Sequence, residues 1–173
     1  RVPQQGEPFH VMSERILVVD DEPSMRKVLG RLLERAGYSV ELAENGQEAL
    51  RRLQDGGIDL VITDIRMPVM DGIELLAAMA PNLPDIPVIV ITAHGTVDTA
   101  VSAMKMGAFD FVSKPFESDQ LLRNCQKALA QSRAERRSVQ TGREGSGVRL
   151  LGTSTESQAL RDWIDKVANL PSA

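Results

Sequence analysis

The chain has 173 residues, 42% of them apolar and 25% charged, with a formal charge of −4. This composition is typical of one well-cored globular domain plus a smaller segment, and the charge is too small to imply a nucleic-acid or membrane surface over the whole molecule. A single cysteine, Cys125, excludes an internal disulfide and fits a reducing cytoplasm. No apolar run approaches the roughly 20 residues that span a bilayer, so we expect a cytoplasmic chain without a membrane partner.

Residues 1–12 lack the apolar core of an export signal and are expected to form a disordered extension. From Arg15 onward, short apolar runs alternate with helical patterns. Runs of this length are typical of strands buried on both faces of a parallel sheet. The predicted strands are Ile16–Val19, Ser39–Ala43, Leu60–Thr63, Val88–Ile91 and Phe109–Val112. The second is the weakest pattern, and we expect it nearer the sheet edge.

A helical pattern follows each predicted strand. The first helix is expected to open at Pro23 or Ser24 and to end at Gly37. Its apolar face is expected to comprise Val28, Leu29, Leu32 and Leu33. Strands and helices that alternate in this way imply right-handed crossovers and a doubly wound parallel α/β sheet.

Polar residues at helix starts support the other boundaries. Asn45 is the expected N-cap of the second helix, and Asp71 with Glu74 forms a capping-box pattern before the third. The fourth helix is expected over Gly95–Met106. A long fifth helix is expected to begin near residue 119, with Ser118 as its cap.

Chemically reactive side chains stand at the predicted carboxyl ends of these strands. In a parallel sheet those ends meet at one edge, where ligands and chemistry collect. The residues there are Asp20, Asp21, Asp64, Thr92 and Lys114. Clustered carboxylates repel one another unless a cation joins them, and Mg²⁺ with its preference for oxygen ligands meets that need. Asp64 is then a candidate nucleophile toward phosphorus, with Thr92 and Lys114 neutralising charge on the phosphoryl oxygens.

Residues 13–130 resemble the receiver domain of two-component response regulators. The resemblance rests on VVDDE at Val18–Glu22, TDIRMPVMDG at Thr63–Gly72, ITAH at Ile91–His94 and FVSKPF at Phe111–Phe116. It implies a flavodoxin-like (βα)5 fold with a five-stranded sheet. It also implies that Asp64 is phosphorylated from the phosphohistidine of a sensor histidine kinase.

The same resemblance implies roles for the residues around Asp64. Asp21 would bind Mg²⁺ directly and Asp20 mainly through water, and the backbone carbonyl of Arg66 would join Asp64 as a further ligand. Lys114 and Pro115 would be joined by a cis peptide bond.

Switching and lifetime roles are implied in the same way. Thr92 and Phe111 would be the switch pair, and Phe111 would couple by packing because it has no hydroxyl. Arg66 and His94 would tune how long the phosphoryl group persists. Viewed alone, His94 would be taken as an ordinary surface histidine.

The chain changes character after residue 130. Residues 131–149 are expected to be a basic helical extension and a glycine-rich linker. A weak heptad-like seam runs through Leu122, Cys125, Leu129, Ser132, Arg136 and Val139. Residues 150–173 resemble the start of the AAA+ domain of NtrC-type, sigma-54-dependent activators. No GxxxxGK[ST] phosphate loop occurs, so we expect no ATP hydrolysis and no enzymatic activity beyond self-phosphorylation and autodephosphorylation.

These resemblances imply partners for the chain. Phosphorylation would shift the surface formed by the fourth helix, the fifth strand and the fifth helix, and thereby change a homodimer. The full-length protein would meet ATP, sigma-54 RNA polymerase and DNA through domains that lie outside this sequence.

Three other interpretations remain open at the level of sequence. An aspartyl-nucleophile phosphatase also attacks phosphorus with a carboxylate, but it would place a second acid where Arg66 stands. A flavodoxin-like nucleotide-binding module would need a phosphate loop after the first strand, and none is present. A receiver joined to a different output domain would keep the whole site unchanged.

Overall fold

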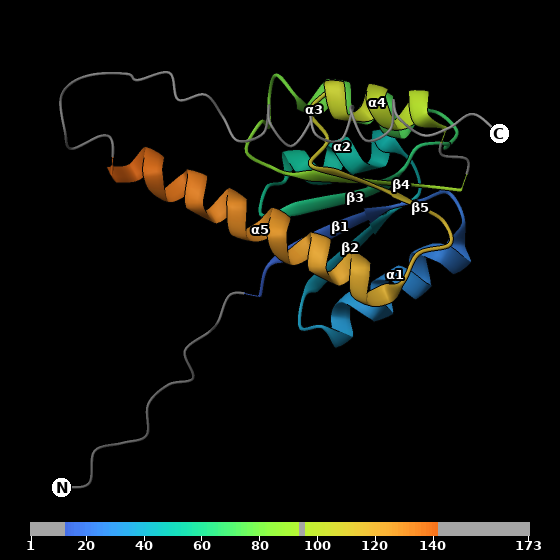
Figure 1. Ribbon diagram of the computed structural model, residues 1–173, viewed down its shortest axis with the longest axis horizontal. Coiled ribbons are helices and arrows are strands. Elements are labelled where there is room, and N and C mark those ends of the chain that lie inside the picture. The colour runs from blue at the N-terminus through green and yellow to red at the C-terminus, as the bar shows by residue number, and fades with distance from the viewer. Residues whose placement is uncertain (1–12, 94–95, 142–173) are drawn as a thin grey trace, which may run out of the picture. The chain divides into compact units, whose positions relative to one another are not determined.

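Five parallel strands form one sheet in the order β2-β1-β3-β4-β5 (Figure 1). The computed structural model describes residues 13–93 and 96–141. Its strands are β1 (Arg15–Val19), β2 (Ser39–Ala43), β3 (Leu60–Asp64), β4 (Val88–Thr92) and β5 (Asp110–Ser113). Its helices are α1 (Pro23–Arg35), α2 (Gly46–Gln54), α3 (Gly72–Met79), α4 (Val97–Lys105) and α5 (Ser118–Thr141). The predicted doubly wound fold is confirmed, with β2 at an edge.

The sheet separates two apolar cores. Helices α2, α3 and α4 cover one face and α1 and α5 cover the other (Figure 1). Alternate residues of each strand point to opposite faces, so Val61 of β3 joins the first core while Leu60 and Ile62 join the second. Truncating a fully buried side chain such as Leu33 of α1 would cost about 2–5 kcal/mol. These cores fix the sheet, and the sheet fixes the residues at its edge.

Capping side chains set the predicted helix starts. The side chain of Asn45 accepts a hydrogen bond from the amide of Glu48 at the start of α2. Asp71 and Glu74 form the complete capping box of α3, as predicted. Helix α4 begins at Val97 with Thr96 as its N-cap, two residues later than the expected Gly95, which lies outside the described residues.

Two helix predictions were wrong in detail. Val28 is 61% exposed, although it was expected on the apolar face of α1. The buried stripe runs through Leu29, Gly30 and Leu33 instead, and Gly30 faces Val40 and Leu42 of β2 with room for a methyl group. Ser118 is the first residue of α5 and not its cap.

Helix α5 continues to Thr141, so the described part of the basic segment, residues 131–141, is helical. Contacts divide the chain into compact units of residues 1–136 and 137–173. Cys125, Leu129 and Ser132 are buried within the first unit, so they cannot form the heptad-like seam suggested by the sequence. Predictions for residues 1–12 and 142–173 lie outside the described residues. No helix within the described part is long and apolar enough to cross a membrane.

We expect Gly30→Ala to raise the free energy of unfolding by about 0.5–1 kcal/mol, because alanine is the better helix former. A methyl group there would lie 3.6 Å from Leu42 and 4.0 Å from Val40, which is ordinary van der Waals contact. Gly37→Ala is the control, since φ at Gly37 is +95° and the same change should destabilise. Urea denaturation measures both, and a less stable Gly30→Ala variant would contradict the packing described for α1.

Candidate functional site

The reactive residues meet at the carboxyl edge of the sheet. Asp20 follows β1, Asp64 ends β3, Thr92 ends β4 and Lys114 follows β5. The parallel register places Thr63 beside Val19, and Asp64 beside Ile91. Adjacent strands therefore deliver their final residues to one place.

Three carboxylates form an acidic cluster at this edge. Ligand oxygens from Asp20, Asp21 and Asp64 all lie within 4.8 Å of one another. The three side chains differ in burial, because Asp20 is only 2% exposed whereas Asp21 is exposed and Asp64 is intermediate. The cluster thus has a buried carboxylate and one open to solvent.

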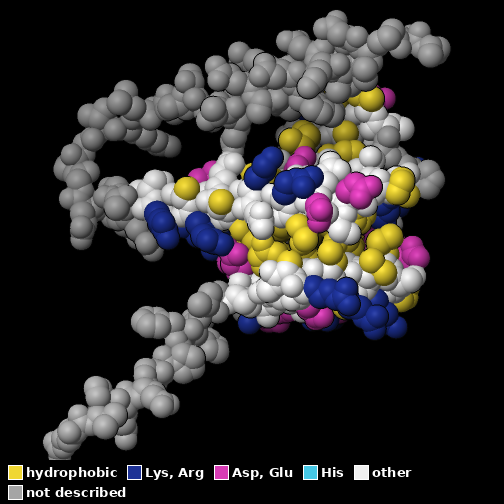
Figure 2. Space-filling model, turned by 60° about the horizontal axis from the view of Figure 1, so that its bottom comes forward, with side chains coloured by type: hydrophobic (Ala, Val, Ile, Leu, Met, Phe, Trp, Pro, Cys, Tyr) yellow, Lys and Arg dark blue, Asp and Glu magenta, His cyan; other side chains and the backbone are white. Residues whose placement is uncertain are grey.

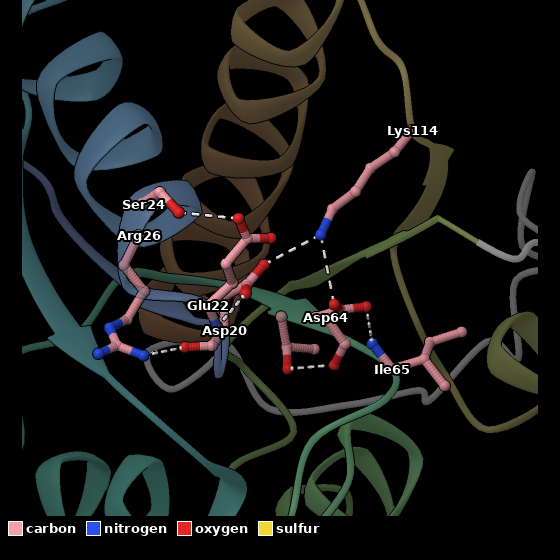
Figure 3. A network of polar contacts seen from close by, with 8 residues as sticks. Asp20, Glu22, Ser24, Arg26, Asp64, Ile65 and Lys114 are labelled. Carbon is pink, nitrogen blue, oxygen red and sulfur yellow. Dashed lines mark hydrogen bonds and ion pairs between the residues drawn. The ribbon is translucent and has the colours of Figure 1, made fainter.

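Lys114 joins two of these acids (Figure 3). Its Nζ lies 3.1 Å from Oδ2 of Asp20 and 3.3 Å from Oδ2 of Asp64. The backbone amide of Lys114 donates to the carbonyl of Thr92 at 2.8 Å, which fixes the start of the side chain against β4. The peptide bond to Pro115 is cis, as the resemblance implies. One ammonium group therefore holds two neighbouring carboxylates together.

The backbone around Asp20 is held by its own loop and by α1. Oδ1 of Asp20 accepts a hydrogen bond from the amide of Glu22 at 2.8 Å. The guanidinium of Arg26 donates to the carbonyl oxygen of Asp20, and Ser24 donates to Glu22 (Figure 3). Sequence reasoning missed Arg26. Its position in the first turn of α1, just beyond the acidic pair, is the signal that could have indicated this contact.

The loop after β3 returns to pass directly over Asp64. The amide of Ile65 donates to Oδ1 of Asp64 at 2.6 Å, and the amide of Gly72 donates to the carbonyl of Ile65 at 2.8 Å. A Cβ atom on Gly72 would lie 2.1 Å from the carbonyl oxygen of Asp64, so only glycine fits. Val69 in the same loop has φ of 70°, which is a strained conformation for a β-branched residue.

Burial and charge shift the pKa values in opposite ways. Burial raises the pKa of Asp20 above 3.8, and hydrogen bonds from Glu22 and Lys114 only partly offset it. Burial alone would lower the pKa of Lys114, but hydrogen bonding and attraction to Asp20 and Asp64 outweigh it and raise that pKa. The ammonium is therefore charged at neutral pH, while the charge on Asp20 is disfavoured.

Three of the remaining predicted residues, Thr92, Phe111 and Arg66, lie within the described part of the chain. Thr92 is buried as the last residue of β4. Phe111 is half-buried in β5 and packs against the core beneath α4. The side chain of Arg66 is exposed, two residues beyond Asp64. His94 lies outside the described residues, and the roles of these four residues stay predictions.

Comparison with known proteins identifies the fold and its relatives. The family described as "Response regulator receiver domain" matches residues 16–126. The transcriptional regulatory protein GlrR of Escherichia coli (strain K12) is 46% identical over 117 residues, covering 68% of this chain and 26% of GlrR. The transcriptional regulatory protein ZraR of Klebsiella oxytoca is 42% identical over 153 residues, covering 88% of this chain and 34% of ZraR.

A solved structure agrees with these relatives. The solution structure of the beryllofluoride-activated NtrC4 receiver domain dimer matches with a TM-score of 0.65 and 39% identity. It covers 68% of this chain and 98% of the NtrC4 chain. The present chain thus spans about a quarter to a third of the length of these two curated relatives. The chain belongs to the response regulator receiver domain family.

Proposed function

We propose that Asp64 accepts a phosphoryl group from the phosphohistidine of a sensor histidine kinase. The observation that carries this proposal is the position of the Asp64 carboxylate, which lies between the Lys114 ammonium and the Ile65 amide at the edge of the sheet. A carboxylate with a fixed orientation and a nearby cation is suited to attack at phosphorus. The chain then stores a signal as an acyl phosphate and does not turn over a substrate.

The two oxygens of Asp64 have different surroundings. Oδ1 accepts from the Ile65 amide, which fixes the plane of the carboxylate. Oδ2 faces Lys114, and we assign the attack on phosphorus to this oxygen. The new bond joins Oδ2 to phosphorus as the bond from phosphorus to the histidine nitrogen breaks, and the electron pair leaves with the imidazole. Lys114 then balances charge on the phosphoryl oxygens.

Asp20, Asp21 and Asp64 would hold Mg²⁺, with the carbonyl of Arg66 as a further ligand. Three carboxylate oxygens within 4.8 Å suit a hard cation that prefers oxygen ligands. The raised pKa of Asp20 also supports a cation, because a buried carboxylate gains from a second positive charge. When bound, Mg²⁺ would neutralise charge on the phosphoryl group and its acceptor.

The proposed moving surface comprises α4, β5 and α5. Helix α4 is lightly attached to the sheet, since its fully buried residues are Ala100 and Ala103. Thr92 ends the strand before α4, and Lys114 lies between β5 and α5. Phe111 packs beneath α4. A phosphoryl group that forms a hydrogen bond with Thr92 would change how α4 and Phe111 pack. Arg66 and His94 would adjust water access to the acyl phosphate.

The output lies in the rest of the protein. GlrR and ZraR are named as transcriptional regulatory proteins and are three to four times longer than the matched region. We propose an NtrC-type protein in which this receiver controls a sigma-54-dependent AAA+ domain that uses ATP, contacts RNA polymerase and precedes a DNA-binding domain. The protein would act in the cytoplasm as a homodimer. This chain would itself have no enzymatic activity beyond gaining and losing its phosphoryl group.

Incubation with acetyl phosphate and Mg²⁺ should add one phosphoryl group to the chain, as measured by intact mass spectrometry. Asp64→Asn should add none, because an amide cannot form the acyl phosphate. Asp98→Asn is the matched control, since this carboxylate is exposed on α4. Equal mass gain in the Asp64→Asn variant would contradict the assignment.

Asp20→Asn should raise the free energy of unfolding in EDTA at neutral pH, because burial disfavours the charged carboxylate. The wild type is not penalised below pH 3.8, where the carboxyl is protonated in both states, and it loses stability as pH rises through the raised pKa. The advantage of the variant should therefore grow with pH over this range. Mg²⁺ should stabilise the wild type more than the variant in thermal melts. A variant less stable than wild type in EDTA at pH 7 would contradict the electrostatic account.

Beryllofluoride with Mg²⁺ should change the mass measured by light scattering, and hydrogen exchange should change over α4, β5 and α5. Thr92→Ala should still gain the phosphoryl mass but lose most of the exchange response, because the hydroxyl proposed to contact the phosphoryl group is gone. Unchanged mass and unchanged exchange in the wild type would rule out the proposed switch.

A further inference from the structure

The C-terminal part of α5 contacts the amino edge of the sheet, which is the edge farther from Asp64. Ser132 is buried, and its hydroxyl donates to the carbonyl of Asp85 at 3.0 Å. Asp85 lies in the loop that leads into β4. The buried stripe of α5, which includes Ala128 and Leu129, therefore extends beyond residue 130 and ends in a specific polar contact.

Two ion pairs follow within one helical turn. The guanidinium of Arg133 bonds to the carboxylate of Glu14, just before β1. The guanidinium of Arg136 lies 3.3 Å from Oδ1 of Asp59, just before β3. Figure 2 shows basic side chains gathered toward the far end of α5, with acidic side chains beside them. The amino ends of β1, β3 and β4 thus each supply one acceptor to α5.

Both acids are positioned by the backbone before α5 reaches them. Oδ2 of Asp59 accepts from the amide of Arg15 at 2.9 Å, which leaves Oδ1 for Arg136. The carbonyl of Glu14 accepts from the amide of Ser39 at 3.0 Å, which anchors this residue beside β2. The carboxylate of Asp59 therefore loses little further freedom when Arg136 binds it, whereas for Glu14 the hydrogen bond fixes the main chain from which the side chain extends.

We propose that residues 132–136 form an ion-pair latch that fixes the C-terminal part of α5 to the amino edge of the sheet. The latch comprises Ser132, Arg133 and Arg136 with their acceptors. The latch makes this turn part of the receiver, so the connector to the output begins only after Arg136. It is a conformational device separate from the phosphoacceptor site, because it shares no residue with that site. The proposal does not depend on phosphorylation of Asp64.

The exposure of both arginine side chains makes the latch sensitive to salt. The side chains of Arg133 and Arg136 are 58% and 44% exposed, so each pair alone contributes little and is screened by ions. The contacts of Ser132, Arg133 and Arg136 act together, because loss of one lets this part of the helix move and weakens the other two. The latch therefore contributes modestly to stability, whereas the buried apolar stripe that precedes it keeps the rest of α5 packed on the sheet.

The test is hydrogen exchange by mass spectrometry on the 173-residue chain, following amides from residue 130 to residue 137. Arg133→Glu combined with Arg136→Glu should speed exchange there by roughly fivefold or more, as loss of about 1 kcal/mol implies. High salt should have the same effect on the wild type. Arg123→Glu is the matched control, because Arg123 is an exposed arginine on the same helix.

A charge swap separates the latch from a general loss of helix. Arg133→Glu alone should speed exchange, and adding Glu14→Arg should restore most of the protection. The far-ultraviolet circular dichroism and the midpoint of urea denaturation should stay close to wild type in every variant, which shows that the unit is folded. Exchange that matches the Arg123→Glu control, or a swap that restores nothing, would overturn the latch.

Discussion

The ammonium of Lys114 between Asp20 and Asp64 is the interaction on which the site depends. Without a cation, carboxylates this close would repel one another, and the buried Asp20 would be the most unfavourable. Lys114 offsets that repulsion while leaving Asp21 open to solvent. The balance of charge at this edge therefore rests on a single ammonium group shared by two carboxylates.

The sheet determines which residues Lys114 can reach. Parallel pairing brings the ends of β1, β3, β4 and β5 to one edge, and two buried cores hold that register. Helix α5 starts next to this edge and, in the proposed latch, is fixed at the other. Between the two places, residues such as Leu121 and Leu129 belong to the apolar core that this helix shares with β1, β3, β4 and β5. The same helix therefore connects the signal input with the connector.

Much of this was predictable from the sequence because the patterns are local. Apolar runs marked the strands, and the acid or lysine after each run marked the shared edge. Capping residues such as Asn45 and Asp71 marked helix starts. The predictions failed where packing between distant segments decides. Val28 was misplaced because α1 approaches β2 at Gly30, and nothing near Gly72 in sequence reveals its contact with the Asp64 carbonyl. The pairs made by Arg133 and Arg136 join residues more than seventy positions apart.

The central claim is that the carboxylate of Asp64 becomes an acyl phosphate. Borohydride reduction after treatment with acetyl phosphate and Mg²⁺ tests this most directly, because it converts an aspartyl phosphate into homoserine at the modified position. Peptide mapping should find homoserine at residue 64 and at no other aspartate. Homoserine at Asp20 or Asp21, or a phosphoryl group that resists reduction because it sits on a hydroxyl, would contradict the account.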